Sequence, residues 1–317
     1  MSSRGPLSES QRGFLPYLAF VGLGLIWGAS FLFFKLGVQD MSPTVLVFVR
    51  SASGAIALAM IMRLSARALH GGNFRERAVH FLIMGVTNAV IPWVAIAWGE
   101  QTISSGLASI LNATTPFWTA VFIFFVIPAE RPSFLNYAGV LLGIVGVIIL
   151  VIPDITANGL SGNVFGALAV VLASMSYAVS ALYQRARMRG MDIFQQSLGQ
   201  LVAASLVAFP LAVPFLPRVH LTFVSMGAVL ALGALGSGVA YLLYYYTMNT
   251  LGPVRATGVT FIVPITAVFW GVVLLHESLS LPIVLGMVVI LAGIVLTNLR
   301  KRPAEQPIAR EKERAAV

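Results

Sequence analysis

The chain has 317 residues, of which 58% are hydrophobic and only 10% charged, and its net charge is +9. Soluble domains carry roughly 25% charged residues, so this composition excludes an ordinary water-soluble protein. The basic residues stand in short segments between apolar runs, which is typical of membrane proteins and argues against nucleic-acid binding. Because the chain contains no cysteine, disulfides, thiolate chemistry and cysteine-based metal sites are excluded.

Apolar runs recur from Phe14 to Leu299. Each is about 20 residues long, enough to cross the ~30 Å hydrocarbon layer as a helix. Proline, glycine and polar side chains separate the runs, and the polar N-terminal stretch precedes a retained first span rather than a cleaved signal peptide. We predict a cytoplasmic tail at 1–13, a basic tail at 300–317, and ten spans near residues 14–36, 43–63, 79–98, 104–127, 134–152, 163–184, 193–213, 222–247, 253–275 and 281–299.

Lysine and arginine are distributed unevenly between the two sides of this arrangement. With the N-terminus inside, seventeen of the 20 basic residues fall on the cytoplasmic side, Lys35 and Arg218 fall on the other side, and Arg50 lies within a span. Positively charged loops stay in the cytoplasm, so we predict that both termini are cytoplasmic.

An internal repeat relates the two halves of the chain. At offsets of 147 to 150 residues many positions recur, for example Trp27 with Tyr177, Trp93 with Tyr241, Pro116 with Pro264, Glu130 with Glu277 and Gly139 with Gly286. We therefore predict two homologous five-helix repeats, at 14–152 and 163–299. Since five is odd, the second repeat must enter the membrane from the opposite face. The predicted fold is an all-α integral membrane protein with two inverted repeats, from which alternating-access transporters are commonly built.

Several segments of this repeat resemble the EamA family of the drug/metabolite transporter superfamily. They are WGASF in the first span, GLASILNATTPFWTAVF and VRATGVTFIVPITAVFWGVVLLHESLS around the fourth and ninth spans, and the glycine-spaced AGVLLGIVGVIIL and LGMVVILAGIVL in the last span of each half. The resemblance implies ten helices with cytoplasmic termini, a central cavity between the halves, and export of amino acids or other small metabolites. Within the family it points to the YddG-type exporters of aromatic amino acids.

Arg50 is the one clear ionisable residue inside a predicted span. It lies about seven residues from Pro43, hence roughly 10 Å from the external end. A charged group at that depth is a functional candidate, because its planar guanidinium can hold a substrate carboxylate. Alternatively, Arg50 extends outward to the membrane surface or bonds to backbone carbonyls of a neighbouring helix, and the sequence leaves both possibilities open. Its repeat partner is Gln200.

Asn88 and Asn112 are amides inside predicted spans, where an unpaired polar group is costly. They could bind substrate or form interhelical hydrogen bonds. On a helical wheel Asn88 shares a face with small residues, and we expect this face to line a cavity rather than to permit close helix packing. The small residues are Gly85, Pro92, Ala95 and Gly99.

The predicted substrate site combines these polar residues with aromatic rings on the first and third helices of each half. Such rings suit apolar or aromatic solutes, although most Trp and Tyr residues of membrane proteins serve packing or the interface. The expected substrate-binding residues are Trp27, Arg50, Asn88, Trp98, Asn112, Tyr177, Ser237, Tyr241 and Tyr244.

Three other charged residues are expected to have structural roles. Lys35, near the external end of the first span, should reach the headgroups as an interfacial anchor. Glu130 and Glu277 stand at equivalent positions where the fourth helix of each half ends. We expect each to cap the following helix or to pair with a nearby base.

Enzyme motifs are absent from the sequence. The histidines are scattered, and HExxH, GxSxG and the P-loop do not occur, so we expect no metal, no cofactor and no ATP hydrolysis. All eleven acidic residues fall in tails, loops or span ends. Proton relays generally need such groups within the membrane, which favours uniport.

The sequence thus predicts a secondary transporter that exports amino acids, including aromatic or neutral ones, or similar metabolites across the bacterial inner membrane by alternating access. Its expected partners are a small-molecule substrate and the lipid bilayer, and the choice between monomer and homodimer stays open. The alternative is a carrier of organic phosphates, nucleotide sugars or other drug-like solutes. An intramembrane enzyme is a distant alternative, because no paired catalytic groups are visible at matching depth.

Overall fold

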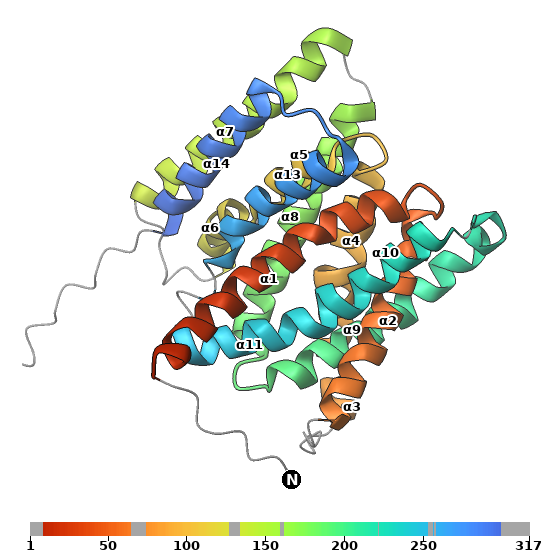
Figure 1. The fold of residues 1–317 in the computed structure, drawn as a ribbon. Coiled ribbons are helices and arrows are strands. Elements are labelled where there is room, and N and C mark those ends of the chain that lie inside the picture. Colours follow the sequence, from red (N-terminus) through yellow and green to blue (C-terminus); the bar gives the residue numbers. More distant parts are fainter. Residues whose placement is uncertain are drawn as a thin grey trace, which may run out of the picture.

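The computed structural model describes residues 9–64, 74–126, 134–158, 162–220, 222–252, 256 and 258–298. These residues form helices and connections, with no strand among them (Figure 1). Eight helical segments are long and apolar enough to cross a membrane, and two shorter apolar helices, Val259–Leu275 and Leu281–Thr297, complete the set. The prediction of an all-α membrane fold with ten helices is confirmed.

The first half contains five spans, two of which are interrupted by a change of helix. They are α1 (Glu9–Gly37), α2 (Pro43–Leu64), the composite span of α3 (Phe74–Gly85), η1 (Val86–Val90) and α4 (Ile91–Gly99), the composite span of α5 (Ser105–Asn112) and α6 (Thr115–Val126), and α7 (Phe134–Asn158). The sequence predicts that this span ends at residue 152, before Pro153, but α7 continues through Pro153 to Asn158. Membrane helices accommodate proline when nearby groups satisfy the freed carbonyl.

The second half repeats this order. Its spans are α8 (Gly162–Arg187), α9 (Ile193–Ala212) with the short 3₁₀ turn η2 (Val213–Arg218), the composite span of α10 (Phe223–Gly233), η3 (Ala234–Val239) and α11 (Ala240–Leu251), α13 (Val259–Leu275), and α14 (Leu281–Asn298). Both η1 and η3 are π-helical turns, each of which widens the third span of its half. Such turns occur frequently at functional sites.

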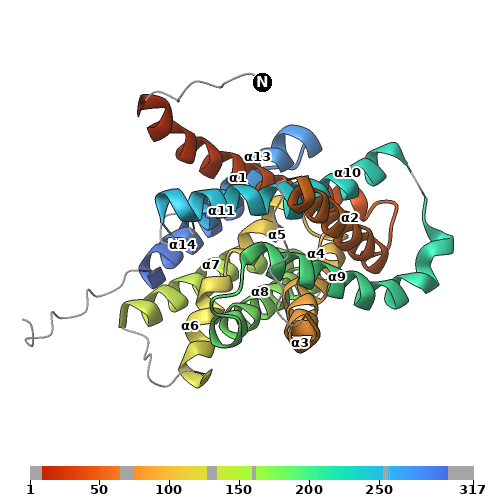
Figure 2. The same ribbon diagram turned by 90° about the horizontal axis from the view of Figure 1, so that it is seen from below.

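Helix packing follows the two-fold relation between the halves. Helices α2 and α9 are repeat equivalents and pack on each other, as do α7 and α14. Helix α1 packs on α10, α11 and α13, while its equivalent α8 packs on α4, α5 and α6. In both views α7 and α14 lie side by side at one edge of the bundle, and α1 crosses beside α11 and α13 (Figures 1 and 2). The halves therefore enclose a shared interior.

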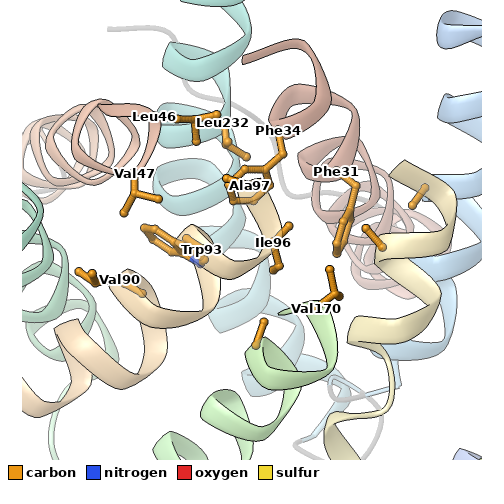
Figure 3. Packing of buried hydrophobic residues seen from close by; sticks show 14 of the residues in the cluster. Phe31, Phe34, Leu46, Val47, Val90, Trp93, Ile96, Ala97, Val170 and Leu232 are labelled. Atoms are coloured by element: carbon orange, nitrogen blue, oxygen red, sulfur yellow. The ribbon is translucent and has the colours of Figure 1, made fainter. Parts of the chain in front are cut away.

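Large apolar side chains from both halves fill the centre of the bundle. Phe31 and Phe34 of α1 meet Trp93 and Ile96 of α4, with Leu232 of α10 beside them (Figure 3). All of these side chains are buried, with exposed fractions between 0% and 5%. In a membrane such packing, rather than the hydrophobic effect, holds helices together.

Candidate functional site

A cavity of about 650 Å³ lies between the two halves. Its lining comes from α1, α2, η1, α4, α5 and α6 of the first half and from α8, α9, η3, α11 and α13 of the second. A site formed by both repeats is the arrangement in which secondary transporters hold their solutes.

The cavity reaches from the middle of the bundle to one end of the helices. Gln184 lines it three residues before the end of α8, and Ile193 lines it as the first residue of α9. Under the predicted topology this is the cytoplasmic end. In the opposite direction along α1 and α2, the lining stops at Phe34 and Arg50.

Eight of the nine predicted site residues line this cavity. They are Trp27, Arg50, Asn88, Asn112, Tyr177, Ser237, Tyr241 and Tyr244. The ninth, Trp98, does not: its side chain is 47% exposed and borders a separate hollow between α4 and α8 on the outer surface. Trp93 and Trp98 are five residues apart on α4, or about 140° around the helix after one full turn. Trp93 faces the cavity, so Trp98 cannot.

The small-residue face predicted around Asn88 is also not a cavity wall throughout. A Cβ atom on Gly85 would lie 2.9 Å from the backbone nitrogen of Ala204, and one on Gly99 would lie 2.7 Å from the carbonyl oxygen of Gly166. These glycines permit close helix packing, contrary to our expectation. The π-helical turn η1 lies between them, and its wider turn shifts the regular helical wheel.

Arg50 lines the cavity, while its binding of a carboxylate stays a prediction. Its guanidinium carbon lies 3.6 Å from the ring centroid of Trp93 and 4.7 Å from that of Phe34. The residue is only 7% exposed, and its Nε atom has no hydrogen-bond partner. Cation–π contacts of this kind contribute about 0.5–2 kcal/mol and fix the plane of the guanidinium. Of the described residues that line the cavity, none is Asp or Glu.

A chain of polar side chains crosses the cavity wall between the halves. Ser180 Oγ donates to Asn88 Oδ1 at 2.9 Å, and Asn88 Nδ2 donates to Gln200 Oε1 at 3.1 Å. Gln200 Nε2 in turn donates to the hydroxyl of Tyr241 at 2.9 Å. Asn88 therefore joins three helices while lining the cavity, and Gln200 lies in the half opposite its repeat equivalent Arg50.

Other lining groups have unused hydrogen-bonding capacity. Ser109 Oγ and Asn112 Oδ1 line the cavity, are buried, and have no hydrogen-bond partner. Trp27 is held by a hydrogen bond from Nε1 to the carbonyl of Gly236 at 3.2 Å, and its ring centroid lies 5.7 Å from that of Tyr244. The cavity thus offers rings, amides and one guanidinium to a solute.

The sequence-based site omitted several lining residues. On α9 they include Gln196, Ser197 and Gln200, whose spacing of one and four residues places them on one side of the helix. A polar stripe in an apolar span was an available signal, because such groups seldom face lipid. Phe34 and Trp93, which stack on Arg50, carry no such signal.

Lys35 and Glu277 lie at the opposite end of the bundle from the cavity opening. Lys35 Nζ donates to the carbonyl oxygens of Glu100 at 2.5 Å and Ile103 at 2.9 Å, so it is not the interfacial anchor that we expected.

Glu277 Oε1 accepts from the Ser105 amide at 2.7 Å and Oε2 accepts from the Gly106 amide at 3.2 Å. Glu277 is a helix cap, as predicted, but it caps α5 of the other half and not the following helix. Glu130 lies outside the described residues.

A further link between the halves lies at the same end. Thr222 Oγ1, at the start of α10, donates to Asp40 Oδ2 at 2.5 Å. This hydrogen bond, with a second from Ser225, lowers the pKa of Asp40. Asp40 is therefore ionised at neutral pH and keeps its acceptor role.

The chain has membrane-spanning helices in two inverted halves with a cavity between them, which is the architecture typical of polytopic membrane transporters. The sequence pattern of the EamA-like transporter family matches residues 14–152 and 164–299. The chain belongs to this family.

Named relatives and a solved structure agree with this assignment. The uncharacterized transporter YoaV of Bacillus subtilis is 24% identical over 283 residues, covering 89% of this chain and 96% of that protein. The uncharacterized inner membrane transporter YedA of Escherichia coli K12 is 26% identical over 299 residues, covering 92% and 94%. One solved crystal structure superposes with a TM-score of 0.63 at 19% identity, covering 94% of this chain and all of that chain, and it shows a shared fold.

Proposed function

We propose that this transporter exports small metabolites that carry a carboxylate, amino acids with aromatic or neutral side chains among them, across the bacterial inner membrane. Transport proceeds by alternating access around the central cavity and is uniport, with both termini in the cytoplasm. The cavity extends to the predicted cytoplasmic end, where an exported solute would enter.

The observation that carries this proposal is the environment of Arg50. A buried guanidinium without a hydrogen-bond partner on Nε, in a cavity whose described lining contains no acid, attracts an anionic group. Stacking on Trp93 and Phe34 holds the guanidinium plane in place. A fixed plane favours a carboxylate, which can accept two parallel hydrogen bonds from it.

The remaining lining supports recognition of the rest of such a solute. The rings of Trp27 and Tyr244 offer apolar contact to a side chain, and Asn112 Oδ1 can accept from an ammonium group. The guanidinium of Arg50 and the amide oxygen of Asn112 therefore match the carboxylate and the ammonium group of an amino acid. An organic phosphate carries more negative charge, and Arg50 is the only Lys or Arg among the described residues that line the cavity. The lining therefore favours carboxylates over phosphates.

The test of this proposal is Arg50→Gln, which copies the amide of the repeat partner Gln200. A hydrogen bond to a charged group contributes about 1.5–3 kcal/mol, so the substitution should weaken binding of a carboxylate substrate about 10- to 150-fold. Candidate amino acids would first be found by metabolite efflux from overexpressing cells. Transport of the best substrate would then be measured in proteoliposomes.

The control compound is the amine that corresponds to the chosen amino acid but lacks its carboxylate. Its transport should hardly differ between the parent and Arg50→Gln. If the variant folds normally and transports both compounds like the parent, Arg50 does not bind the carboxylate and the proposed substrate class is wrong.

A further inference from the structure

The interface between the halves is closed at the end beyond Phe34 and Arg50. Phe34, Glu100 and Ser105 have exposed fractions of 2%, 0% and 0%. We use the name closed end for the region formed by Lys35, Glu100, Ser105 and Glu277. Under the predicted topology it faces the outside of the cell.

The closed end is held by contacts within and between the halves. Glu277, from the second half, accepts two amide hydrogen bonds at the N-terminus of α5 in the first half. Lys35 of α1 bonds to two carbonyls at and beyond the end of α4. Opening this end would have to break the contact of Glu277 with α5, because that contact joins the two halves.

Glu100 is the unexplained residue of this region. It follows α4, whose span ends at Gly99, and it is completely buried, yet neither of its carboxyl oxygens has a hydrogen-bond partner. The charged groups that act on it are Lys35 of α1 and Glu277 of the α13–α14 connection. The positive charge of Lys35 and the negative charge of Glu277 cancel, so an ionised Glu100 would add one uncompensated negative charge to this region.

A buried carboxylate without donors is strongly disfavoured against the neutral acid. Burial raises the pKa of the Glu100 carboxyl well above its usual range; the ammonium of Lys35 opposes this effect and the carboxylate of Glu277 adds to it. Once this end opens to water, the burial is lost and the ordinary acidity of the group returns.

We propose that Glu100 is a proton-binding site whose occupation keeps the closed end shut. The acid is neutral while this end is closed and loses its proton when the end opens. Because a raised pKa in the closed state means that this state binds the proton more tightly, low pH favours closure. As the pH rises through the raised pKa, closure loses this support and opening becomes easier.

The position of Glu100 decides which pH matters. The acid lies beyond Phe34 and Arg50, on the far side of the cavity from its opening, so its proton exchanges with the external solution when this end opens. A proton that enters and leaves on one side is not carried across the membrane. The site is therefore a pH-sensitive gate and is compatible with uniport.

The test uses the natural absence of cysteine in the chain. Ser105 is completely buried at the closed end and its Oγ makes no hydrogen bond, so Ser105→Cys introduces a thiol that a reagent reaches only when this end opens. Its labelling by a membrane-impermeant maleimide would be measured in intact cells from about pH 5.5 to about pH 8.5, spanning the usual acid and thiol ranges. The matched protein carries Glu100→Gln in addition, which mimics the neutral acid at every pH.

Both proteins share the intrinsic pH dependence of the thiol. The labelling rate of Ser105→Cys divided by that of Ser105→Cys with Glu100→Gln therefore measures how the proton on Glu100 affects opening. One linked proton allows this ratio to rise by at most about tenfold per pH unit, and we expect a rise of that kind as external pH increases. A ratio that stays constant overturns the proposal. No substrate is needed, so this result is independent of whether Arg50 binds a carboxylate.

A second measurement covers the case in which Glu100→Gln fails to fold. Ser105→Cys alone would be labelled in right-side-out vesicles at one fixed external pH while the internal pH is varied. The gate predicts an unchanged rate, because Glu100 exchanges its proton with the outside. A rate that follows the internal pH contradicts the proposal.

Discussion

Gly271 leaves the space that the carboxylate of Glu277 occupies. A Cβ atom at Gly271 would lie 2.3 Å from Glu277 Oε2 and 2.9 Å from Ser105 Oγ. Gly271→Ala must therefore push the carboxylate away from the α5 amides. Hydrogen bonds to a charged group are worth about 1.5–3 kcal/mol, and we expect the free energy of unfolding to fall by about that amount. Thermal unfolding of the purified protein in detergent measures the change.

Gly227→Ala is the matched control for this substitution. Gly227 lies on α10, and a Cβ atom there would meet nothing within 4 Å. Alanine is also the better helix former, so the control should unfold at the same temperature as the parent or slightly above it. If both variants lose stability equally, the contact between Glu277 and α5 does not stabilise the fold.

Individual residues were predicted unevenly from the sequence. The position of Arg50 seven residues into its span follows from counting residues along a helix, and α2 does begin at Pro43. Its stacking between Phe34 and Trp93 depends on how α1, α2 and α4 pack, which no local pattern encodes. The same reason explains Glu277: its acidic type indicated a helix cap, but the helix that it caps lies about 170 residues away in the chain.

The pair of helices α7 and α14 is packed around glycines. A Cβ atom on Gly139 would lie 2.6 Å from the carbonyl oxygen of Gly293 and 2.7 Å from the amide nitrogen of Thr297. The backbone of α14 cannot yield without moving the whole helix. We therefore expect Gly139→Ala to lower the free energy of unfolding by about 1–3 kcal/mol, as overpacking does. Unfolding with a chemical denaturant in mixed micelles measures it.

The repeat equivalent of Gly139 provides an internal comparison. A Cβ atom on Gly286 would meet the end of the Leu150 side chain, at 2.5 Å from Cγ, while the nearest backbone oxygen lies 3.2 Å away. A leucine side chain can change rotamer, so Gly286→Ala should cost less than Gly139→Ala. If Gly286→Ala costs more than Gly139→Ala, the contact with the α14 backbone does not determine the cost.

Whole elements were predicted more accurately than residues. The bilayer requires apolar runs of about 20 residues, so the spans are visible directly in the sequence. The π-helical turns η1 and η3 were not predicted, because their residues are as apolar and small as those of the neighbouring helices. The errors at Trp98, Gly85 and Gly99 all lie in the span that contains η1.

For the whole molecule, the orientation in the membrane is the prediction open to direct test. The excess of basic residues on one side predicts that an alkaline phosphatase fused after Val317 is inactive and that a fluorescent protein at the same position is bright. Fusions truncated after Gly190 and after Leu216 provide the comparison, since the first should behave as cytoplasmic and the second as external. Phosphatase activity after Val317 would contradict the model and would reverse the side assigned to Glu100.

The two π-helical turns indicate which features of the chain came before the duplication of its halves and which came after it. The offset of 148 that relates the third spans carries η1 onto residues 234–238, which lie within η3 (Ala234–Val239). An irregularity at the same place in both halves is most simply inherited from the single ancestral half, so the π-helical turn is older than the duplication. Arg50 and Gln200 are equivalents that differ, so at least one of them changed afterwards. The unequal charge of the cavity is thus a later acquisition, made on a framework that already had matching π-helical turns inside the third span of each half.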